Sequence, residues 1–324
     1  MRPVRQKYKY GAKGLGLHRG AGLRGAARRG AGLRAGIAVL ALAALVPGCT
    51  DVPFDRLEGA YGQQPLKAPP ARALDAYASK LGQAHARRVA AAQRWGLAET
   101  PLPAPPAPVR KPAIRTREGF EADGHEELEL PPVFTTVPTK DKVVFLTVDD
   151  GAEKDPEFLR MMSDLQIPYT AFLSNYLIKD NYRYFRKMRD RGVGLSNHTL
   201  HHAYLPGLPY AEQQYEICGM QRVMERQFGK RPTLLRPPYG NYDGDTLRAA
   251  KSCGIEYAVL WAEEVFVDRW EYREWDQDLH PGDIVLTHFR GRNEWNGSMP
   301  DLVRHFMEKV TDKGYAVARL EDYL

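Results

Sequence analysis

From Lys142 to the end of the chain, short apolar runs alternate with helical patterns, and this alternation constrains the fold more than any other feature of the sequence. Strands that alternate with helices form a parallel sheet, because each helical crossover returns the chain to the same end of the sheet. The sequence therefore predicts an α/β fold, either a (β/α) barrel or an open sheet. The predicted strands are 143–148, 169–173, 193–197, 233–236, 256–261, 283–288 and 315–319.

Helix-start and helix-stop residues support the same alternation. Asp155 and Pro156 form the pattern of an N-cap followed by proline at the first helical position. Glycine follows most of the other predicted helices, as is typical just beyond a helix C-terminus. In a barrel and in an open sheet alike, functional residues gather at the carboxyl ends of the strands. The predicted helices are 156–165, 182–191, 211–228, 245–253 and 299–313.

The first 48 residues have the composition of a targeting segment, with many Lys and Arg and no Asp or Glu. An uncharged, largely apolar run follows at residues 35–46, shorter than the roughly 20 residues that a membrane span needs. Small residues then precede Cys49, which resembles the lipidation box of bacterial lipoproteins. An ordinary signal peptide and an uncleaved anchor are the alternatives. We expect an exported protein, held by a lipid on Cys49 at the extracellular face of the cell membrane.

The net charge of +6 belongs to this leader rather than to the rest of the chain. Without residues 1–48, the chain has 36 Lys or Arg against 40 Asp or Glu, so its net charge is negative. A basic surface for a phosphate backbone is therefore not expected, and we predict no nucleic-acid partner. No motif of the sequence indicates a protein partner.

Residues 49–135 have the composition of a tether, which would hold a folded domain at residues 136–324 away from a membrane. Residues 74–97 are predicted to form one helix, whose weak apolar stripe need not pack on anything. Residues 101–112 are rich in Pro and Ala, which favours an extended, semi-rigid spacer.

Besides Cys49, the chain has two cysteines, Cys218 and Cys253. In an oxidising compartment they could pair as a disulfide, and they could equally be two separately buried thiols. The sequence does not decide between these alternatives, because it gives no distance between the two residues.

Acidic and histidine residues follow two of the predicted strands. Residues 147–151 read TVDDG, so two adjacent carboxylates end an apolar strand, although Asp-Gly is also a common turn dipeptide. One carboxylate can bind a metal while the other handles a proton. Residues 197–202 read NHTLHH, in which His198 and His202 are four apart. On a helical turn this spacing puts both imidazoles on one face, as a single metal site requires, whereas His201 faces elsewhere.

Two further strands also end in candidate residues. Residues 236–240 read RPPYG, in which two prolines fix an extended backbone and Gly240 permits an unusual turn. Such a rigid loop can aim a backbone N–H group at a developing oxyanion, although a purely structural turn uses the same residues. His288 ends the apolar run 284–288, where a lone histidine is more often structural than catalytic. Its place at a strand end, like that of the other groups, favours a catalytic role.

In this order, TVDDG, HTLHH, RPPYG and IVLTH resemble the motifs of the polysaccharide deacetylase family, also called the NodB-homology or family 4 carbohydrate esterases. The resemblance covers about residues 140–324. It implies an irregular (β/α) barrel of about seven strands, which agrees with the number of predicted strands. It also implies a hydrolase that removes acetyl groups from a cell-wall or extracellular polysaccharide such as peptidoglycan or a chitin-like polymer.

The resemblance implies a centre for one divalent metal ion. Asp150, His198 and His202 would bind the metal and leave open positions on it. Zinc is the expected ion, and cobalt and nickel are the alternatives. Zinc can lower the pKa of a bound water molecule to about 7, which makes that water a usable nucleophile for an amide.

The resemblance also implies the groups that move protons and contact the substrate. Asp149 would be the catalytic base, and Arg236 would pair with it and favour its charged form. The N–H group of Tyr239 would contact the substrate and help to bind the oxyanion. His288 would be the general acid that protonates the departing amine.

One family motif is poorly matched. Residues 261–270 stand where the family has an aromatic and acidic segment, and Trp261 is expected to form a wall of the substrate groove. Either Glu264 or Asp268 could be the acid that braces Arg236. This mismatch keeps two alternatives open: an O-acetyl esterase on xylan-like glycans, and a catalytically silent glycan-binding lipoprotein.

Aromatic and basic residues beside these motifs have two interpretations each. Trp270 and Trp275 could stack on the apolar faces of sugars, or they could simply pack within the domain. Arg290 and Arg292 follow the last motif and could contact an anionic glycan, or they could be solvated.

Overall fold

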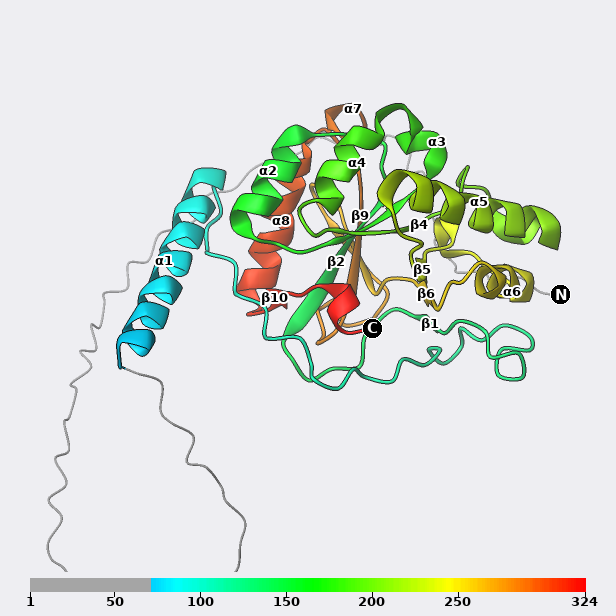
Figure 1. Cartoon of the computed structure of the whole chain (residues 1–324), viewed down its shortest axis with the longest axis horizontal. Helices are drawn as coiled ribbons and strands as arrows, with labels where there is room; N and C mark the ends of the chain where they lie inside the picture. The colour runs from blue at the N-terminus through cyan, green and yellow to red at the C-terminus, as the bar shows by residue number, and fades with distance from the viewer. Residues whose placement is uncertain (1–70) are drawn as a thin grey trace, which may run out of the picture. The chain divides into compact units, whose positions relative to one another are not determined.

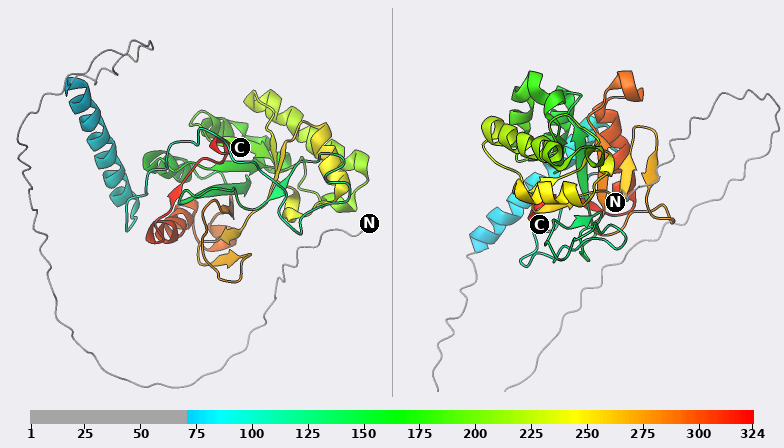
Figure 2. Two further views of the ribbon diagram at one scale, coloured as in Figure 1. Left: turned by 90° about the horizontal axis from the view of Figure 1, so that it is seen from below. Right: turned by 90° about the vertical axis from the view of Figure 1, so that its right-hand side faces the viewer.

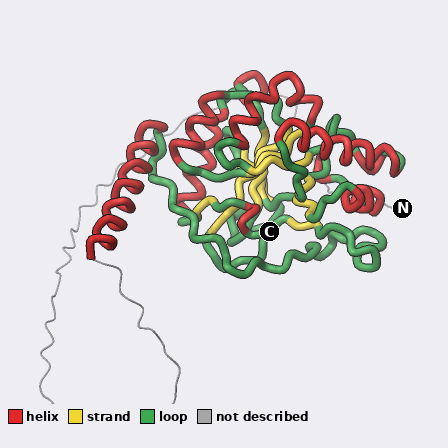
Figure 3. Tube along the Cα trace, viewed as in Figure 1, coloured by secondary structure: helices red, strands yellow, loops and turns green. Residues whose placement is uncertain are grey.

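The computed structural model describes residues 71–324, so the leader, Cys49 and the first part of the predicted tether lie outside the described residues. Within this range, Figures 1 and 3 show the strands gathered in the centre of the domain and the helices on the outside. No helix among residues 71–324 is long and apolar enough to cross a membrane.

The strands form one sheet of ten. They are β1 (Val133–Phe134), β2 (Val143–Asp150), β3 (Thr170–Leu173), β4 (Gly194–Asn197), β5 (Leu234–Leu235), β6 (Tyr257–Val259), β7 (Glu263–Val265), β8 (Trp270–Tyr272), β9 (Ile284–His288) and β10 (Ala316–Val317). The α-helices are α1 (Ala71–Trp95), α2 (Pro156–Leu165), α3 (Asn175–Ile178), α4 (Tyr182–Arg189), α5 (Tyr210–Phe228), α6 (Gly244–Ser252), α7 (Arg292–Trp295) and α8 (Met299–Asp312).

The strands follow the order β1-β6-β5-β4-β3-β2-β9-β7-β8, and β10 pairs with β2 beside this path. The pairings between these strands are parallel except that of β7 with β8, which is antiparallel. Beyond the named strands, the Ile284 N–H donates to the Thr135 carbonyl at 3.1 Å, and the Ala262 N–H donates to the Ile284 carbonyl at 2.9 Å. The first bond ties the residue after β1 to the start of β9, and the second continues the pairing of β7 with β9, so the sheet curls into the irregular, mostly parallel barrel that the sequence predicts.

Strand β2 lies in the middle of the sheet and is buried along its whole length. It pairs with β3, β9 and β10. A strand that is covered on both faces reads as a continuous apolar run, which explains why this segment is the clearest strand in the sequence. Its last two residues, Asp149 and Asp150, therefore reach the carboxyl edge of the sheet between the ends of β3 and β9.

Local capping signals set the ends of the helices. At the start of α2, the Asp155 carboxylate accepts from the Glu157 N–H at 2.7 Å, and proline occupies the first helical position. Ser298 and Asp301 form a capping box at the start of α8. Helix α5 ends at Gly229, which has a φ of 78°. These signals are readable in the sequence, and the five predicted helices of the domain agree with the observed ones within two residues.

Part of the segment that the sequence assigns to the tether belongs to the folded domain. β1 pairs with β6, and the Arg117 guanidinium donates to Thr135 Oγ1 at 2.8 Å. The hydroxyl of Tyr242 donates to the Phe120 carbonyl at 2.6 Å, and Ile114 packs on the core. Figure 2 shows this coil, in teal, lying against the domain. Because its apolar side chains are partly buried there, the stretch from Ile114 to β1 is not a free spacer.

Helix α1 is exposed along most of its length and packs only at its C-terminal end. Ala91 and Ala92 are buried in the main hydrophobic cluster. The Trp95 indole N–H donates to Asp164 Oδ2 at 3.0 Å, and Arg304 Nε donates to the Trp95 carbonyl at 2.8 Å. The prediction that this helix need not pack is therefore wrong for its last turns, where two small residues allow close contact.

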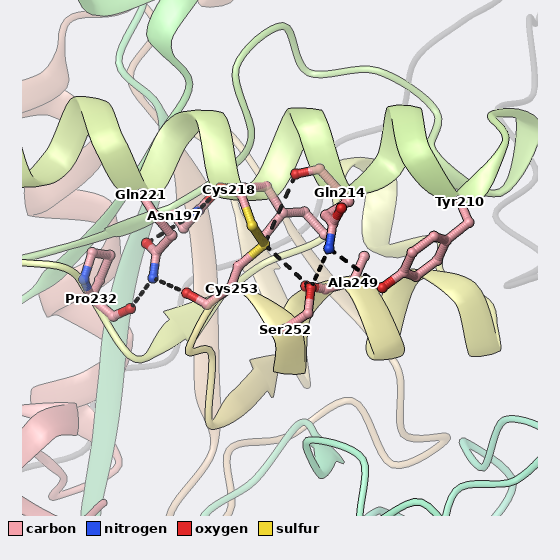
Figure 4. Close-up of a disulfide and its surroundings, with 10 residues drawn as sticks. Asn197, Tyr210, Gln214, Cys218, Gln221, Pro232, Ala249, Ser252 and Cys253 are labelled. Carbon is pink, nitrogen blue, oxygen red and sulfur yellow. Dashed lines mark hydrogen bonds between the residues drawn. A yellow bond between two sulfur atoms is a disulfide. The ribbon is translucent and has the colours of Figure 1, made fainter.

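A disulfide joins Cys218 of α5 to Cys253, the residue that follows α6. Figure 4 shows the bond between the two helices, which also share hydrogen bonds at this place. The Gln214 amide donates to Ser252 Oγ at 2.8 Å, and the Gln221 amide donates to the Cys253 carbonyl at 3.1 Å. The Cα atoms of Cys218 and Cys253 lie 5.0 Å apart, a separation that a disulfide spans readily. Of the two alternatives that the sequence leaves open, the structure has the paired one.

We expect this disulfide to contribute about 2–4 kcal/mol to the free energy of unfolding, because it closes a loop in the unfolded chain and so lowers the conformational entropy of the unfolded state. Urea unfolding of a Cys218→Ala/Cys253→Ala variant, compared with the wild type under non-reducing conditions, measures this contribution. Reducing the wild type serves as the matched control and should lower its midpoint toward that of the variant. Alkylation of both thiols in unreduced, denatured protein would contradict the bond.

Candidate metal and acid–base site

The candidate residues of the sequence meet at the carboxyl edge of the sheet. In the register of β2 with β9, Asp149 stands opposite His288. In the register of β4 with β5, Asn197 stands opposite Leu235, so the histidine motif begins beside the residue that precedes Arg236. Four motifs that are far apart in the chain therefore end side by side.

The turn after β2 separates the two adjacent carboxylates. Asp150 has a φ of 79° and Gly151 a φ of 91°, so the backbone leaves the strand through the left-handed region. A Cβ atom at Gly151 would lie 2.6 Å from Ile178 Cγ2 and 3.0 Å from Phe185 Cζ, so only glycine fits there. The turn directs Asp149 toward Arg236 and Asp150 toward the histidines.

The histidine motif forms an irregular loop. The prediction that His198 and His202 share one face of a helical turn is therefore wrong. Thr199 has a φ of 70° and His202 a φ of 57°. Side chains hold this backbone: Asn197 Oδ1 accepts from the Thr199 N–H at 2.8 Å, and Ser174 Oγ donates to the His198 carbonyl at 2.6 Å. Two positive-φ residues bring the imidazoles together, with their ring centres 4.8 Å apart.

Asp150, His198 and His202 form a group that could hold a metal ion. Asp150 Oδ1 lies 3.6 Å from His198 Nε2 and 3.4 Å from His202 Nε2. This buried oxygen has no hydrogen-bond partner among the described residues. His198 Nδ1 lies 2.6 Å from the Arg236 carbonyl, which can only accept, so Nδ1 carries the proton and Nε2 presents a lone pair. The three side chains therefore fit a divalent cation.

The protonation of the two histidines suits that role. Burial, assisted by the charge of His202, lowers the pKa of His198 to about 3. Burial also lowers the pKa of His202, although the carboxylates of Asp150 and Asp149 oppose this. Both imidazoles are therefore neutral near pH 7, and only a neutral imidazole binds a metal.

Arg236 holds Asp149 from a fully buried position. Its Nη1 donates to Asp149 Oδ1 at 2.7 Å and to Thr147 Oγ1 at 2.9 Å. Its Nε and Nη2 donate to the carbonyls of Val259 and Leu260 at 3.0 and 3.2 Å. Because these four hydrogen bonds hold the guanidinium in place, it fixes the carboxylate in one orientation.

Burial raises the pKa of Asp149 and outweighs the opposing charge and hydrogen bond of Arg236. The sequence correctly predicts that Arg236 pairs with Asp149. Arg236 alone would lower the pKa of Asp149, but the net shift of this pKa is upward. A raised pKa makes this carboxylate a better proton acceptor. Its second oxygen, Oδ2, lies 3.7 Å from Nε2 of His198, one of the candidate metal ligands.

His288, at the end of β9, is held by Glu264 of the neighbouring strand β7. His288 Nδ1 lies 3.2 Å from Glu264 Oε1. Burial alone would lower the pKa of His288, but the hydrogen bond and charge of Glu264, together with Asp150, raise it above its ordinary value. Asp268, the other candidate for a bracing acid, is exposed and pairs with Arg269. Neither acid braces the buried arginine by a hydrogen bond, contrary to the sequence expectation.

The comparisons with known proteins agree with this geometry. The sequence model described as "Polysaccharide deacetylase" matches residues 136–258. An uncharacterised protein of Streptomyces coelicolor is 41% identical over 203 residues, which cover 62% of this chain and 81% of the relative. The chain belongs to the polysaccharide deacetylase family.

One characterised relative of this deacetylase is the peptidoglycan-N-acetylmuramic acid deacetylase PdaA of Bacillus subtilis. It is 27% identical over 201 residues, which cover 57% of this chain and 73% of the relative. A solved structure of Bacillus subtilis PdaA, described as a family 4 carbohydrate esterase, matches with a TM-score of 0.51 and 22% identity over 66% of this chain and 94% of that chain. At this identity the structural likeness concerns the fold alone.

The two predicted substrate contacts of the deacetylase, Trp261 and Tyr239, differ in their exposure. Trp261 is only 6% exposed and lies beside the Arg236 guanidinium, 5.6 Å from its ring centre, so little of it could face a sugar. This burial corrects the prediction of a groove wall. Tyr239 is 58% exposed, has a φ of 61°, and places its ring 4.6 Å from that of His202. It stands at the rim of the candidate metal site.

The structure also distinguishes between the interpretations of the surrounding aromatic and basic residues. Trp270 packs against Phe306, with 6.0 Å between ring centres, whereas Trp275 is exposed. Arg290 Nη2 donates to Asp150 Oδ2 at 2.6 Å, and Arg290 Nε lies 2.7 Å from Glu294 Oε2. Arg290 therefore orients a candidate metal ligand of the deacetylase, a role that its position after the last motif does not reveal.

Proposed function

We propose that this polysaccharide deacetylase hydrolyses the N-acetyl amide of an N-acetylglucosamine-type polysaccharide, peptidoglycan or a chitin-like polymer, to a free amine and acetate. One observation carries the proposal: two adjacent carboxylates at one strand end face different partners. Asp149 is held by a buried arginine, and Asp150 faces two neutral histidines. These residues and His288, which stands opposite Asp149 in the sheet, would supply a base, the metal ligands and a general acid, the groups that amide hydrolysis requires. Peptidoglycan is the substrate that the name of PdaA indicates.

The metal of this site is proposed to be zinc, with cobalt or nickel as alternatives. Asp150, His198 and His202 would hold it, because neutral imidazoles and a carboxylate are suitable ligands for these ions. When bound, the metal would supply Lewis-acid polarisation and would lower the pKa of a water molecule.

The residues of this chain would then move the protons. The Asp149 carboxylate would accept a proton from the water that attacks the acetyl carbonyl, while Arg236 keeps that carboxylate in place. The N–H group of Tyr239 would donate to the oxyanion that forms. His288, held by Glu264, would give its proton to the nitrogen as the carbon–nitrogen bond breaks.

Substrate choice is tested by acetate release from three polymers. Purified full-length protein, loaded with zinc, is offered N-acetylglucosamine oligomers, peptidoglycan and O-acetylated xylan, with Asp149→Asn as the inactive control. We expect release from one or both N-acetylated substrates and little from xylan. Release from xylan alone would indicate an O-acetyl esterase. Absence of release from all three polymers by folded, metal-loaded protein would indicate a glycan-binding protein instead.

The pH dependence tests the role of His288. A general acid must be protonated, so kcat/KM should fall as the pH rises through the raised pKa of His288. Glu264→Gln removes the neighbouring charge and should lower that pKa, which moves the alkaline limb of the profile to lower pH. Asp268→Asn, at an exposed carboxylate, is the matched control and should leave the limb unchanged. An unshifted limb in Glu264→Gln would contradict the assignment of His288.

Attachment to the membrane is also a proposal. A lipid on Cys49 would place the enzyme at the extracellular face of the membrane, near a cell-wall polysaccharide. Metabolic labelling with a fatty-acid analogue should mark the wild type and not Cys49→Ser. Equal labelling of the two proteins, or labelling of neither, would rule out a lipid on this residue.

A further inference from the structure

A second group of potential metal ligands lies at the opposite end of β9 from His288. It consists of Glu263, the first residue of β7, Asp283, which precedes β9, and His280 in the preceding loop. One ligand atom from each residue lies within 4.8 Å of the others. In the register of β7 with β9, Glu263 stands opposite Val285, three residues before His288. The group is therefore separate from the site that contains Asp150.

Glu263 is the most unusual member of this group. It is only 1% exposed, and no donor group among the described residues gives a hydrogen bond to its carboxylate oxygens; its polar neighbour is the carboxyl group of Asp283. None of the ion pairs in residues 71–324 includes it. A buried carboxylate without a partner is unfavourable, and proteins ordinarily pair such a group or use it to bind a cation.

The other two members, Asp283 and His280, contact each other. Asp283 is buried, accepts from Thr136 Oγ1 at 2.9 Å through Oδ1, and accepts from the His280 N–H at 2.6 Å through Oδ2. His280 Nε2 lies 3.0 Å from Asp276 Oδ2, and its Nδ1 lies 3.2 Å from Asp283 Oδ2. If Asp276 accepts the hydrogen bond of Nε2, Nδ1 of His280 is left to bind a metal beside Asp283. A carboxylate on the other ring nitrogen is common around metal-bound histidines.

We propose that Glu263, His280 and Asp283 bind one divalent transition-metal ion that stabilises the fold. Two carboxylates and one imidazole form a mixed oxygen and nitrogen set of the kind that zinc accepts. His280 is about half exposed, with 42% of its side chain accessible, so the ion has a path from solvent. The bound ion would join the start of β7 to the loop before β9, and β7 also carries Glu264, which holds His288.

The alternative occupant of this place is a proton. Burial and then the charge of Asp283 raise the pKa of Glu263 to about 10, so a proton shared by these two acids would also relieve their repulsion. A proton and a metal ion make different predictions for the zinc content of the protein, which does not depend on whether the proposed deacetylation is correct.

Equilibrium dialysis of full-length protein against zinc, followed by measurement of bound zinc, tests the site. We expect two ions per chain in the wild type and one in Glu263→Gln, in which the amide is too weak a ligand. His280→Ala, at a half-exposed residue that should not disturb folding, is also expected to bind one. Glu271→Gln, on the adjacent strand β8, is the matched control and should keep two.

Thermal unfolding supplies a second readout. Zinc should raise the Tm of Asp150→Asn, which keeps the proposed second site, by several degrees. Zinc should leave the Tm of Asp150→Asn/His280→Ala unchanged. A zinc content that is the same in the wild type, Glu263→Gln and His280→Ala would overturn the proposal in favour of the shared proton.

Discussion

An Asp149→Asn variant is expected to release acetate about 10²–10⁴-fold more slowly than the wild type, the usual cost of losing a proton-transfer group. The asparagine amide cannot accept the proton of the attacking water, but its oxygen can still accept the bond from Arg236. The fold and the proposed metal ligands should therefore remain. Steady-state acetate release at saturating zinc, with zinc content measured in parallel, gives the result.

The control for this prediction is Asp312→Asn, at an exposed carboxylate near the end of α8. It has the same chemical change and should keep wild-type activity. If Asp149→Asn retained activity within about tenfold of the wild type, with its zinc content unchanged, another group would have to be the base.

An Arg236→Leu variant is expected to lose about 3–5 kcal/mol of unfolding free energy, the cost of leaving one member of a buried ion pair without its partner. Arg236 is fully buried and donates to Asp149, Thr147 and two backbone carbonyls. Leucine fills part of the space but donates to none of them. Urea unfolding under non-reducing conditions measures the loss.

Two comparisons separate the charge from the packing in this variant. Arg222→Leu, on the exposed surface of α5, should change the unfolding free energy by no more than about 0.5 kcal/mol. Adding Asp149→Asn to Arg236→Leu removes the unpaired carboxylate and should recover part of the lost stability. A cost below about 1 kcal/mol for Arg236→Leu alone would show that the pair is not held as the structure indicates.

The order of strands and helices is predictable because the signals that determine it are local. β2 is apolar throughout, and Asp155, Ser298 and Gly229 mark helix ends. The strands β1, β7 and β8 have two or three residues each, too few to show an alternation. β1 also pairs with β6 and β7 with β9, and the sequence does not display such contacts between distant strands.

The candidate metal ligands and the arginine–carboxylate pair are also predictable, because they lie at the carboxyl ends of predicted strands. The path of the histidine loop is not, since two residues with positive φ, Thr199 and His202, replace the expected helical turn. The choice between Glu264 and Asp268 depends on the register of β7 with β9. That register is a long-range property, and it places Glu264 within contact distance of His288.

Residue type also does not reveal which way a side chain faces. Trp261 has the expected chemistry for a sugar contact, yet it is buried beside Arg236. Arg290 looks like a solvated loop residue in the sequence, yet it donates to the candidate metal ligand Asp150. Glu263 lies in the poorly matched segment and attracts notice only when its burial is known.

The proposed metal centre is tested most directly by acetate release before and after metal removal. Full-length protein is stripped with a chelator and titrated with zinc on an N-acetylglucosamine oligomer, beside Asp150→Asn treated in the same way. We predict that release from the wild type disappears on stripping and returns with zinc, whereas Asp150→Asn stays inactive throughout. Release that survives complete stripping, or that is equal in Asp150→Asn, would contradict a metal centre at Asp150, His198 and His202.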